Sequence, residues 1–250
     1  MSGAPAPRFA DDFAVFLDFD GTLVPIVDRP DLTEVPDALR TTLQAAHAAL
    51  NGALAIITGR TIADLDALLA PLCLPAAGVH GLEYRDNPGV TLDTAATPLP
   101  NWARAAITDL VSMDPGLLIE DKRHSLALHY RQAPGQQNTV RAAIRDIIDK
   151  LGPDFVFQDG KMVLEIRPAG ETKGTAVTRF MAEPPYAGRR PVFIGDDITD
   201  EDAFAVVNAL GGDSIKVGPH AYASVARHAL ADVDAVRAWL HPWPAHKNHQ

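Results

Sequence analysis

Two aspartates, Asp18 and Asp20, directly follow a short apolar run at residues 13–17 and precede Gly21. A run this short that ends in a Gly-containing turn is typical of a buried strand. Side chains two residues apart on an extended segment point to the same side. Two carboxylates there are costly to bury without a cation, and hard divalent ions such as Mg²⁺ prefer oxygen ligands. The pair therefore predicts a magnesium site, with a plain acidic turn after a strand as the alternative.

Two further segments offer groups that suit a phosphate. Thr58, Gly59 and Arg60 end a second apolar run, where a hydroxyl and backbone N–H groups before a helix can bind an anion. An ordinary threonine helix cap would explain the same residues. Lys173 lies at the start of a helical pattern, where the helix dipole favours anions rather than cations. Its position indicates an anionic ligand, with a solvated surface lysine as the alternative.

An acidic cluster follows a third apolar run. Asp196, Asp197 and Asp200 come after residues 191–194, and they precede a helical pattern. Asp196 at the strand end can bind a metal directly, whereas Asp200 is also well placed to cap the helix. In a parallel sheet the carboxyl ends of the strands meet at one edge, the usual place for ligands. We therefore expect these acids, the threonine and the lysine to converge there.

Strands and helices alternate in the first and last thirds of the chain, which predicts parallel strands with right-handed crossovers. The expected strands are residues 13–17, 53–57, 76–79, 191–194 and 214–217, and the expected helices cover 36–50 and 61–69 and begin at 172, 201 and 222. The fold class is α/β, a Rossmann-like parallel sheet.

The middle of the chain has a different pattern. Helices are expected at residues 102–111 and 140–151, and strands at 117–120, 126–130, 155–157 and 162–166. Asp159-Gly160 is a strong signal for a hairpin turn, so the adjoining strands should be antiparallel. We predict a core formed by residues 1–100 and 168–250, with an inserted α+β module at 101–167 and a hinge at 168–170.

Composition limits the partners. The formal charge of −10 argues against nucleic acid, whose affinity comes largely from Lys and Arg at phosphates. Cys73 is the single cysteine, which excludes an internal disulfide and is compatible with a reducing compartment. The first residues lack a signal-peptide pattern, and no uncharged apolar run is long enough to cross a bilayer. We expect a cytoplasmic monomer that acts on a small molecule and has neither a nucleic-acid nor a membrane partner.

Together, the segments Asp-x-Asp-Gly-Thr, Thr-Gly-Arg, Lys-Gly and Gly-Asp-Asp-x-x-Asp resemble the haloacid dehalogenase superfamily of phosphohydrolases. The inserted module is similar to that superfamily's type 2 cap. More narrowly, the chain resembles the trehalose-6-phosphate phosphatases from about residue 15 to residue 217. That resemblance is carried by residues 18–26, 80–83, 120–122, 129–131, 164–168 and 195–201.

The resemblance implies a mechanism for phosphate transfer. Asp18 would be the nucleophile that forms an aspartyl-phosphate, and Asp20 the general acid and base. Mg²⁺ would be held by Asp18, the backbone carbonyl of Asp20, and Asp196, with Asp197 and Asp200 in support. Lys173 would pair with Asp18 and the phosphate. Thr58 and the backbone amides near Asp20, at Gly21, would bind the phosphate oxygens, and Arg60 would contact the substrate.

The resemblance also implies that the inserted module selects the substrate, trehalose 6-phosphate in trehalose biosynthesis. Glu120, Lys122 and Glu165 would bind the sugar distal to the phosphate, because charged groups make strong hydrogen bonds to hydroxyls. An exposed ion pair between Glu120 and Lys122 is the alternative. We expect a structural role for His129 and Arg131, and a supporting or junction role for His80 and Glu83.

Other functions remain open at this point. Sucrose phosphate and glucosylglycerol phosphate are alternative substrates, because a fold does not fix its substrate. A phospho-receiver domain also uses clustered aspartates, a threonine, a lysine and Mg²⁺, but its acidic pair precedes the phosphorylated aspartate and it lacks a large insertion. A sugar-phosphate mutase or a silent sugar-phosphate sensor could share the scaffold.

Overall fold

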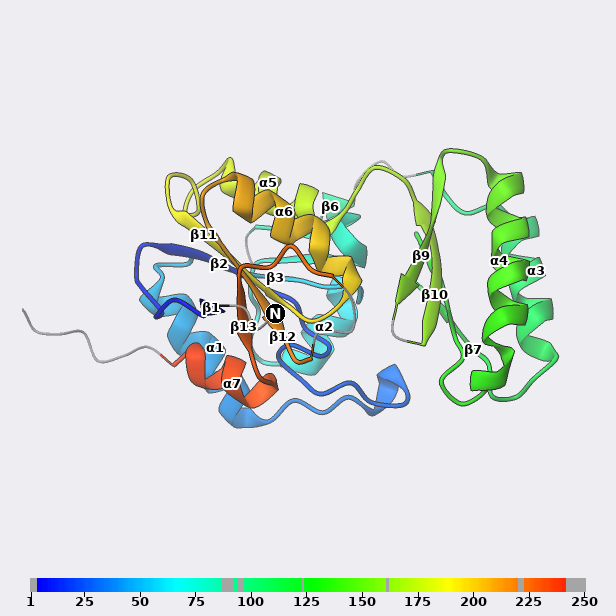
Figure 1. Ribbon diagram of the computed structural model, residues 1–250, viewed down its shortest axis with the longest axis horizontal. Coiled ribbons are helices and arrows are strands. Elements are labelled where there is room, and N and C mark those ends of the chain that lie inside the picture. The colour runs from blue at the N-terminus through cyan, green and yellow to red at the C-terminus, as the bar shows by residue number, and fades with distance from the viewer. Residues whose placement is uncertain are drawn as a thin grey trace, which may run out of the picture.

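The computed structural model describes residues 4–86, 92–93, 97–122, 124–160, 162–219 and 223–241. Within these ranges the chain forms two sheets, and helices pack on both (Figure 1). The larger sheet has nine strands. Going across the sheet, the strands from β1 at one edge as far as β4 are parallel to one another, whereas β5 and β6 at the other edge run antiparallel to their neighbours. In spatial order they are β1 (Ala4–Pro5), β13 (His228–Leu230), β12 (Asp213–Val217), β11 (Arg190–Gly195), β2 (Phe13–Leu17), β3 (Leu54–Ile57), β4 (Ala76–Gly78), β5 (Glu83–Arg85) and β6 (Leu92–Asp93).

Helices cover both faces of this sheet. Figure 1 shows α5 and α6 on one side and α1 and α7 on the other. Their bounds are α1 Asp37–Ala49, α2 Ile62–Leu69, α5 Lys173–Met181, α6 Glu201–Ala209 and α7 Val233–Trp239. Every residue of the central strands β2 and β3 is buried, because the sheet is covered on both faces. We call this body the core.

Three short 3₁₀ helices follow core strands at the edge where the parallel strands end. They are η1 (Pro30–Leu32), η2 (Val79–Gly81) and η4 (Ile198–Asp200). Together with the residues that directly follow β2, β3 and β11, they form the edge that faces the second sheet.

The second sheet has the order β7-β8-β10-β9, and all of its neighbouring strands are antiparallel. Its elements are α3 (Asn101–Ser112), β7 (Leu118–Asp121), β8 (Leu126–His129), η3 (Pro134–Gln136), α4 (Gln137–Leu151), β9 (Phe155–Gly160) and β10 (Val163–Pro168). In Figure 1 the sheet lies towards the core, and α3 and α4 pack on its far side. We call residues 101–168 the cap.

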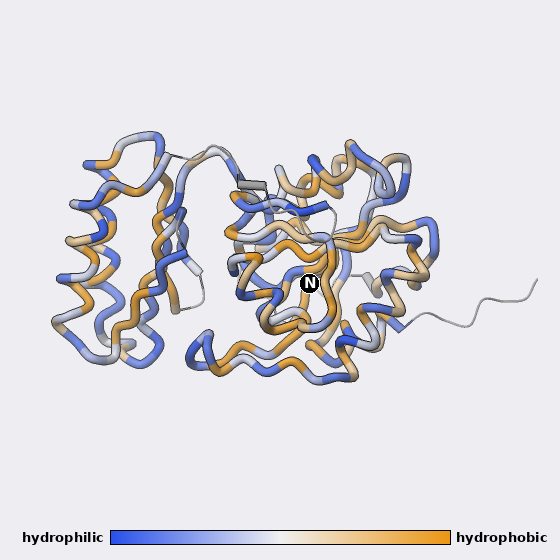
Figure 2. Tube along the Cα trace, turned by 180° about the vertical axis from the view of Figure 1, so that it is seen from behind, coloured by the Kyte–Doolittle hydropathy of each residue, from blue (hydrophilic) through white to orange (hydrophobic). Residues whose placement is uncertain are grey.

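Each body has its own hydrophobic interior. One cluster of buried residues joins the core strands and helices, and a second runs from Leu99 through α3, α4 and the cap strands to Ile166. Figure 2 shows hydrophobic residues concentrated in the strands of both bodies. The predicted fold class, a parallel α/β core with an inserted α+β cap, is confirmed, whereas the exact domain limits at residues 101 and 167 stay a prediction.

Two local predictions were wrong. The hairpin is antiparallel as predicted, but its turn does not fall on Asp159 and Gly160, because both belong to β9 and Gly160 pairs with Val163. Met162 supplies the positive φ, 64°, that such a tight turn requires. The helix expected from residue 222 is also absent from the described residues 223–232, which carry β13, and α7 begins only at Val233. Residue 222 itself lies outside the described ranges.

Within the described residues, no helix combines the length and apolar character needed to cross a membrane.

Three aromatic rings join the first and last parts of the core. Phe16 of β2, Phe180 of α5 and Tyr186 are all fully buried, with ring centroids 5.0–5.8 Å apart. The Tyr186 hydroxyl donates a hydrogen bond to the carbonyl oxygen of Leu54 at 3.2 Å. Because these rings come from distant segments, they hold together the halves of the core that flank the cap in sequence.

We expect Phe180→Ala to lower the free energy of unfolding by about 3–5 kcal/mol, because it removes a buried ring and leaves a cavity. Urea unfolding of the purified proteins measures the change. Met113→Ala, which truncates a side chain that is 69% exposed, is the control and should cost less than about 0.5 kcal/mol. Similar losses in the two variants would contradict this account of the core.

Candidate active site

The site begins where β2 ends between β3 and β11. The backbone N–H of Asp18 still donates to the carbonyl oxygen of Ile194, at 2.9 Å, so the Asp18 side chain is fixed at the sheet edge and is 5% exposed. The chain then turns tightly, with Gly21 N–H donating to the Val24 carbonyl oxygen at 2.7 Å. Gly21 has φ +86°, and a Cβ on it would lie 2.2 Å from an oxygen of Asp196. Glycine is therefore required here both for the turn and for the approach of Asp196.

Lys173 joins two carboxylates inside the protein. Its Nζ donates to Oδ1 of Asp18 and to Oδ1 of Asp200, both at 2.6 Å. Thr172 caps α5 in front of it, so the helix start is stabilised by a capping box and the lysine side chain is left for the acids. Burial alone would lower the pKa of Lys173, but Asp18 and Asp200 raise it well above its usual range. The ammonium group therefore stays charged.

Asp18 is surrounded by more negative charge than Lys173 balances. Burial raises its pKa, Lys173 opposes the rise, and Asp200 and Asp196 add to it. The Thr22 hydroxyl donates to the second oxygen of Asp18 at 3.3 Å. A further positive charge beside Asp18 would favour its ionised form.

The acidic loop after β11 is ordered by Asp200. Its Oδ2 accepts hydrogen bonds from the backbone N–H groups of Asp196 at 2.8 Å and Asp197 at 2.9 Å. Gly195 is needed beside it, because a Cβ there would lie 2.3 Å from the Asp200 carboxyl carbon. Behind the loop, the fully buried Lys216 of β12 donates to the Asp196 carbonyl oxygen at 2.9 Å. The prediction of site residues missed Lys216, although a lysine in an otherwise buried strand was a visible signal.

Three carboxylates meet at this point. Asp18, Asp196 and Asp200 each offer an oxygen, and these oxygens lie within 4.8 Å of one another. Such an all-oxygen group suits a hard divalent cation. The Asp20 carboxylate lies outside this group, and Asp197 caps η4 through the backbone N–H of Ile198.

Arg60 grips Asp20. Its Nε and Nη2 donate to the two carboxylate oxygens of Asp20, each at 2.7 Å, and Nη2 also donates to the Thr33 hydroxyl at 2.7 Å. Thr58, at the end of β3, accepts a hydrogen bond from the Arg60 backbone N–H at 3.2 Å. The paired geometry fixes the plane of the Asp20 carboxylate. The guanidinium group thus has protein partners, and its predicted contact with substrate stays a prediction.

The cap contributes a second charged group. Lys122 Nζ lies 3.9 Å from Glu120 and 3.7 Å from Glu165, and the His129 ring lies 2.8 Å from Glu120. Lys122 is 8% exposed, so the exposed ion pair considered for Glu120 and Lys122 does not describe these residues. Glu165 also accepts from the Ser125 hydroxyl.

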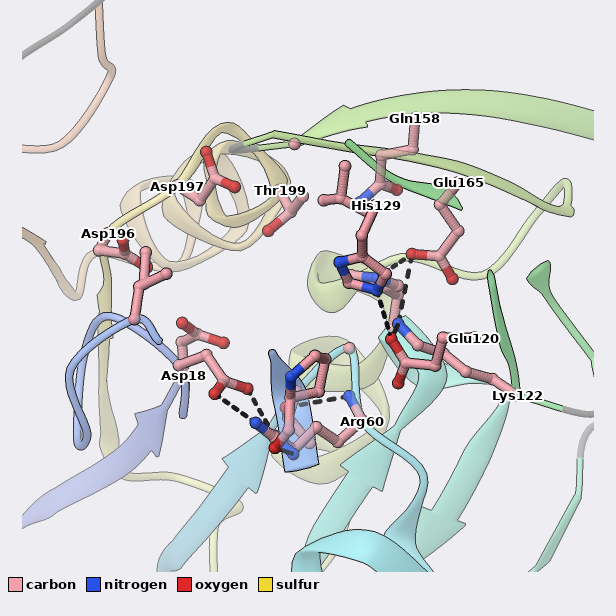
Figure 3. A pocket seen from close by; sticks show the side chains of 18 of the residues that line it. Asp18, Arg60, Glu120, Lys122, His129, Gln158, Glu165, Asp196, Asp197 and Thr199 are labelled. Carbon is pink, nitrogen blue, oxygen red and sulfur yellow. Dashed lines mark hydrogen bonds and ion pairs between the residues drawn. The ribbon is translucent and has the colours of Figure 1, made fainter. Parts of the chain in front are cut away.

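One cavity of about 180 Å³ connects the two groups. Figure 3 shows Glu120, Lys122 and Glu165 across it from Asp18 and Asp196. Its lining includes most of the residues predicted for the site: Asp18, Asp20, Thr58, Arg60, Glu120, Lys122, Glu165, Lys173, Asp196 and Asp197. Gly21 and Asp200 lie behind this lining and support it. His80, His129 and Arg131 also line the cavity, as do Gln158 and Thr199, which the sequence did not single out.

The charged residues of the cap should make the free energy of unfolding depend on pH. Burial would raise the pKa of Glu165, but Lys122, His80 and Ser125 together hold it well below its usual range. Ionised Glu165 therefore adds stability above its ordinary pKa near 4.5, and this contribution is lost as the pH falls towards the lower folded-state value. Between about pH 4.5 and 2.5, the unfolding free energy of the natural protein should fall more steeply than that of Glu165→Gln.

Urea unfolding at a series of pH values tests this expectation. Glu34→Gln makes the same chemical change at an exposed position and is the control. If Glu165→Gln showed the same pH dependence as the natural protein, the carboxylate would not be stabilised by its neighbours.

Comparisons with known proteins agree with this geometry. Residues 16–235 match the family model described as trehalose-phosphatase. The chain is 43% identical to a probable trehalose-phosphate phosphatase of Sinorhizobium fredii, over 91% of this chain and 86% of that protein. It is also 43% identical to the trehalose-6-phosphate phosphatase of Escherichia coli, over 94% and 87%. The C-terminal domain of a Candida albicans trehalose-6-phosphate phosphatase has the same fold, with a TM-score of 0.81 at 24% identity and coverage of 91% and 90%. The chain therefore belongs to the trehalose-phosphatase family.

Proposed function

We propose that the protein is a Mg²⁺-dependent phosphatase that hydrolyses trehalose 6-phosphate to trehalose and inorganic phosphate, as a step of trehalose biosynthesis. One observation carries this proposal: a single cavity is lined by Asp18 and Lys173 from the core and by Glu120, Lys122 and Glu165 from the cap. Membership of the trehalose-phosphatase family supports the reaction, and the names of the 43% identical relatives support the sugar.

The core residues suit a bound phosphate. Lys173 provides a fixed positive charge beside Asp18, and the Thr58 hydroxyl lies at the end of the adjacent strand. The backbone N–H groups of Phe19 and Asp20 would supply further donors, whereas the predicted donor at Gly21 is already bonded to the Val24 carbonyl oxygen. Phosphoryl transfer needs mainly positioning and charge stabilisation, which such a set provides.

The reaction has two steps. An Asp18 carboxylate oxygen forms a bond to phosphorus as the bond to the sugar oxygen breaks, and Asp20 gives that oxygen a proton. Water then attacks the phosphorus, Asp20 takes its proton, and the bond to Asp18 breaks to release phosphate. Both Asp20 oxygens accept hydrogen bonds from Arg60 in this structure, so one of them has to be released from Arg60 before Asp20 can carry the proton.

The donor set fits Mg²⁺, because three buried carboxylates offer oxygens within 4.8 Å of one another. Asp18 and Asp196 would hold the ion with the backbone carbonyl of Asp20. Both oxygens of Asp200 are already engaged by Lys173 and by backbone N–H groups, so Asp200 supports the loop instead. When bound, the ion supplies positive charge that offsets the repulsion between Asp18 and the phosphate.

The cap residues suit a sugar. Glu120 and Glu165 accept hydrogen bonds from hydroxyl groups and Lys122 donates to them, and bonds to charged groups are the stronger ones. The site uses residues of one chain, so the proposal includes a monomer. It also includes a cytoplasmic location, with which the single cysteine is compatible.

Phosphate release from a panel of sugar phosphates tests the proposed function. We expect trehalose 6-phosphate to be preferred by at least about tenfold in kcat/KM over glucose 6-phosphate, sucrose 6-phosphate and glucosylglycerol phosphate, because the 43% identical relatives are named for this substrate. EDTA should abolish activity and added Mg²⁺ should restore it. Equal rates on glucose 6-phosphate would contradict a disaccharide site, and isomerised sugar phosphate without free phosphate would indicate a mutase.

Asp18→Asn should lower kcat by at least about 1000-fold, because an amide cannot form the phosphorylated intermediate. Its thermal unfolding should stay cooperative. Labelled phosphate should appear transiently on the natural protein, on trapping with acid, and not on the variant. A stable phosphoprotein without turnover would instead indicate a receiver domain.

A further inference from the structure

His80 lies directly after β4 in an unusual backbone conformation. Its φ is 57° and that of Val79 is 46°, so both residues lie in the left-handed region. This region is uncommon for residues other than glycine and is rare for a β-branched residue such as Val79. Two hydrogen bonds hold this turn: Val79 N–H donates to the Arg60 carbonyl oxygen at 2.8 Å, and His80 N–H to that of Thr58 at 3.0 Å. Backbone strain of this kind persists where the surrounding structure enforces it, and it concentrates at functional sites.

The turn directs the His80 ring under the cap. A Cβ on Gly59 would lie 2.9 Å from both Cε1 and Nε2 of His80, so the ring occupies space that only glycine leaves open. Its Nε2 lies 3.1 Å from Oε2 of Glu165, which is on cap strand β10. His80 is 6% exposed and lines the same cavity as Asp18 and Lys173. The ring therefore connects the phosphate end of the cavity with the cap.

The protonation of the ring follows from its partners. Glu165 is ionised beside Lys122 and can only accept hydrogen bonds, so the hydrogen between the two side chains belongs to His80 Nε2. Burial lowers the pKa of His80, against the attraction of Glu165, which leaves the second ring nitrogen unprotonated. Nδ1 is thus a hydrogen-bond acceptor. It is buried and has no hydrogen-bond partner among the residues that the structure describes.

A buried acceptor without a partner is costly, and native proteins rarely leave one unexplained. Phosphate oxygens carry negative charge and would be repelled by the Nδ1 lone pair. A hydroxyl group of a sugar can donate to it. His80 lines the same cavity as Lys173 and Glu165, so a sugar phosphate bound there would bring its hydroxyl groups near the ring.

We propose that His80 is a sugar-binding residue supplied by the core: its Nε2–H orients Glu165, and its Nδ1 accepts a hydrogen bond from a hydroxyl of the sugar phosphate. This inference rests on the proposed function and extends it, because sugar selection then depends on the core as well as on the cap. Within the cap, Glu165 is already held by Ser125 and Lys122, and His80 adds the contact from the core.

The test compares kcat/KM for trehalose 6-phosphate with kcat/KM for p-nitrophenyl phosphate, which has no sugar. His80→Ala should lower the first value by roughly tenfold or more and the second by less than about threefold. His80→Asn keeps an acceptor near the Nδ1 position and tolerates the left-handed backbone, so it should fall between the natural protein and His80→Ala. If thermal unfolding shows that His80→Ala is not folded, His80→Asn replaces it in the comparison. His47→Ala, in α1 and outside the cavity lining, is the matched control and should change neither value.

A second comparison separates direct contact from an effect through Glu165. In a Glu165→Ala background, His80→Ala should still lower kcat/KM for trehalose 6-phosphate by at least about threefold, because the Nδ1 contact is lost separately. No further loss in that background would overturn the contact with the sugar. An equal loss on both substrates in the single variant would overturn the whole inference and leave His80 a structural residue. If the natural protein itself did not prefer trehalose 6-phosphate, the proposed function would fail first, whatever the variants showed.

Discussion

The buried contact of Lys173 with Asp18 and Asp200 is the interaction on which the rest of the site depends. It joins residues that are 155 and 27 positions apart in the sequence, each at the end of a different element of the core. Removing one partner of such a group leaves an unpaired buried charge, which typically costs about 3–5 kcal/mol. The folded chain therefore has to bring the ends of β2, η4 and α5 to the same point. Because Asp200 also holds the backbone N–H groups of Asp196 and Asp197, the same contact fixes the acidic loop.

The charges at this point favour a cation and then a phosphate in a definite order. Asp18, Asp196 and Asp200 bring three carboxylates, whereas Lys173 and the buried Lys216 bring two ammonium groups. If all five are ionised, the centre is negative and repels a phosphate. A divalent cation reverses the sign of the charge, after which an anionic substrate is attracted. Burial and the negative charge of Asp200 and Asp196 both raise the pKa of Asp18, and the same negative charge would favour the proposed divalent cation.

The sequence predicted the parts of this site whose signals are local. Asp18 follows a run too short for a helix, and the acids at 196–200 follow another, so their places at strand ends could be read directly. It could not predict which partners meet, because His80 with Glu165 and Arg60 with Asp20 are contacts between separate segments. The two errors have the same origin. Asp159-Gly160 is a good turn sequence, but cross-strand pairing puts Gly160 opposite Val163, and β13 is only three residues long, with no pattern that sets it apart from a helix start.

In the proposed function the cap supplies most of the charged groups that would meet the sugar, and their pairing explains how they could select it. Glu120, Lys122 and Glu165 satisfy one another's charges, with His129 and Ser125 as further partners, so the cap can face the core without leaving an ion unpaired. A sugar has to replace part of these contacts with its own hydroxyl groups. Hydroxyls in the wrong places would leave buried charges unsatisfied, and such mismatches discriminate far more strongly than apolar contacts do. The internal pairing of the cap would therefore contribute to selectivity together with His80 of the core, because a ligand without matching donors and acceptors would break these contacts without replacing them.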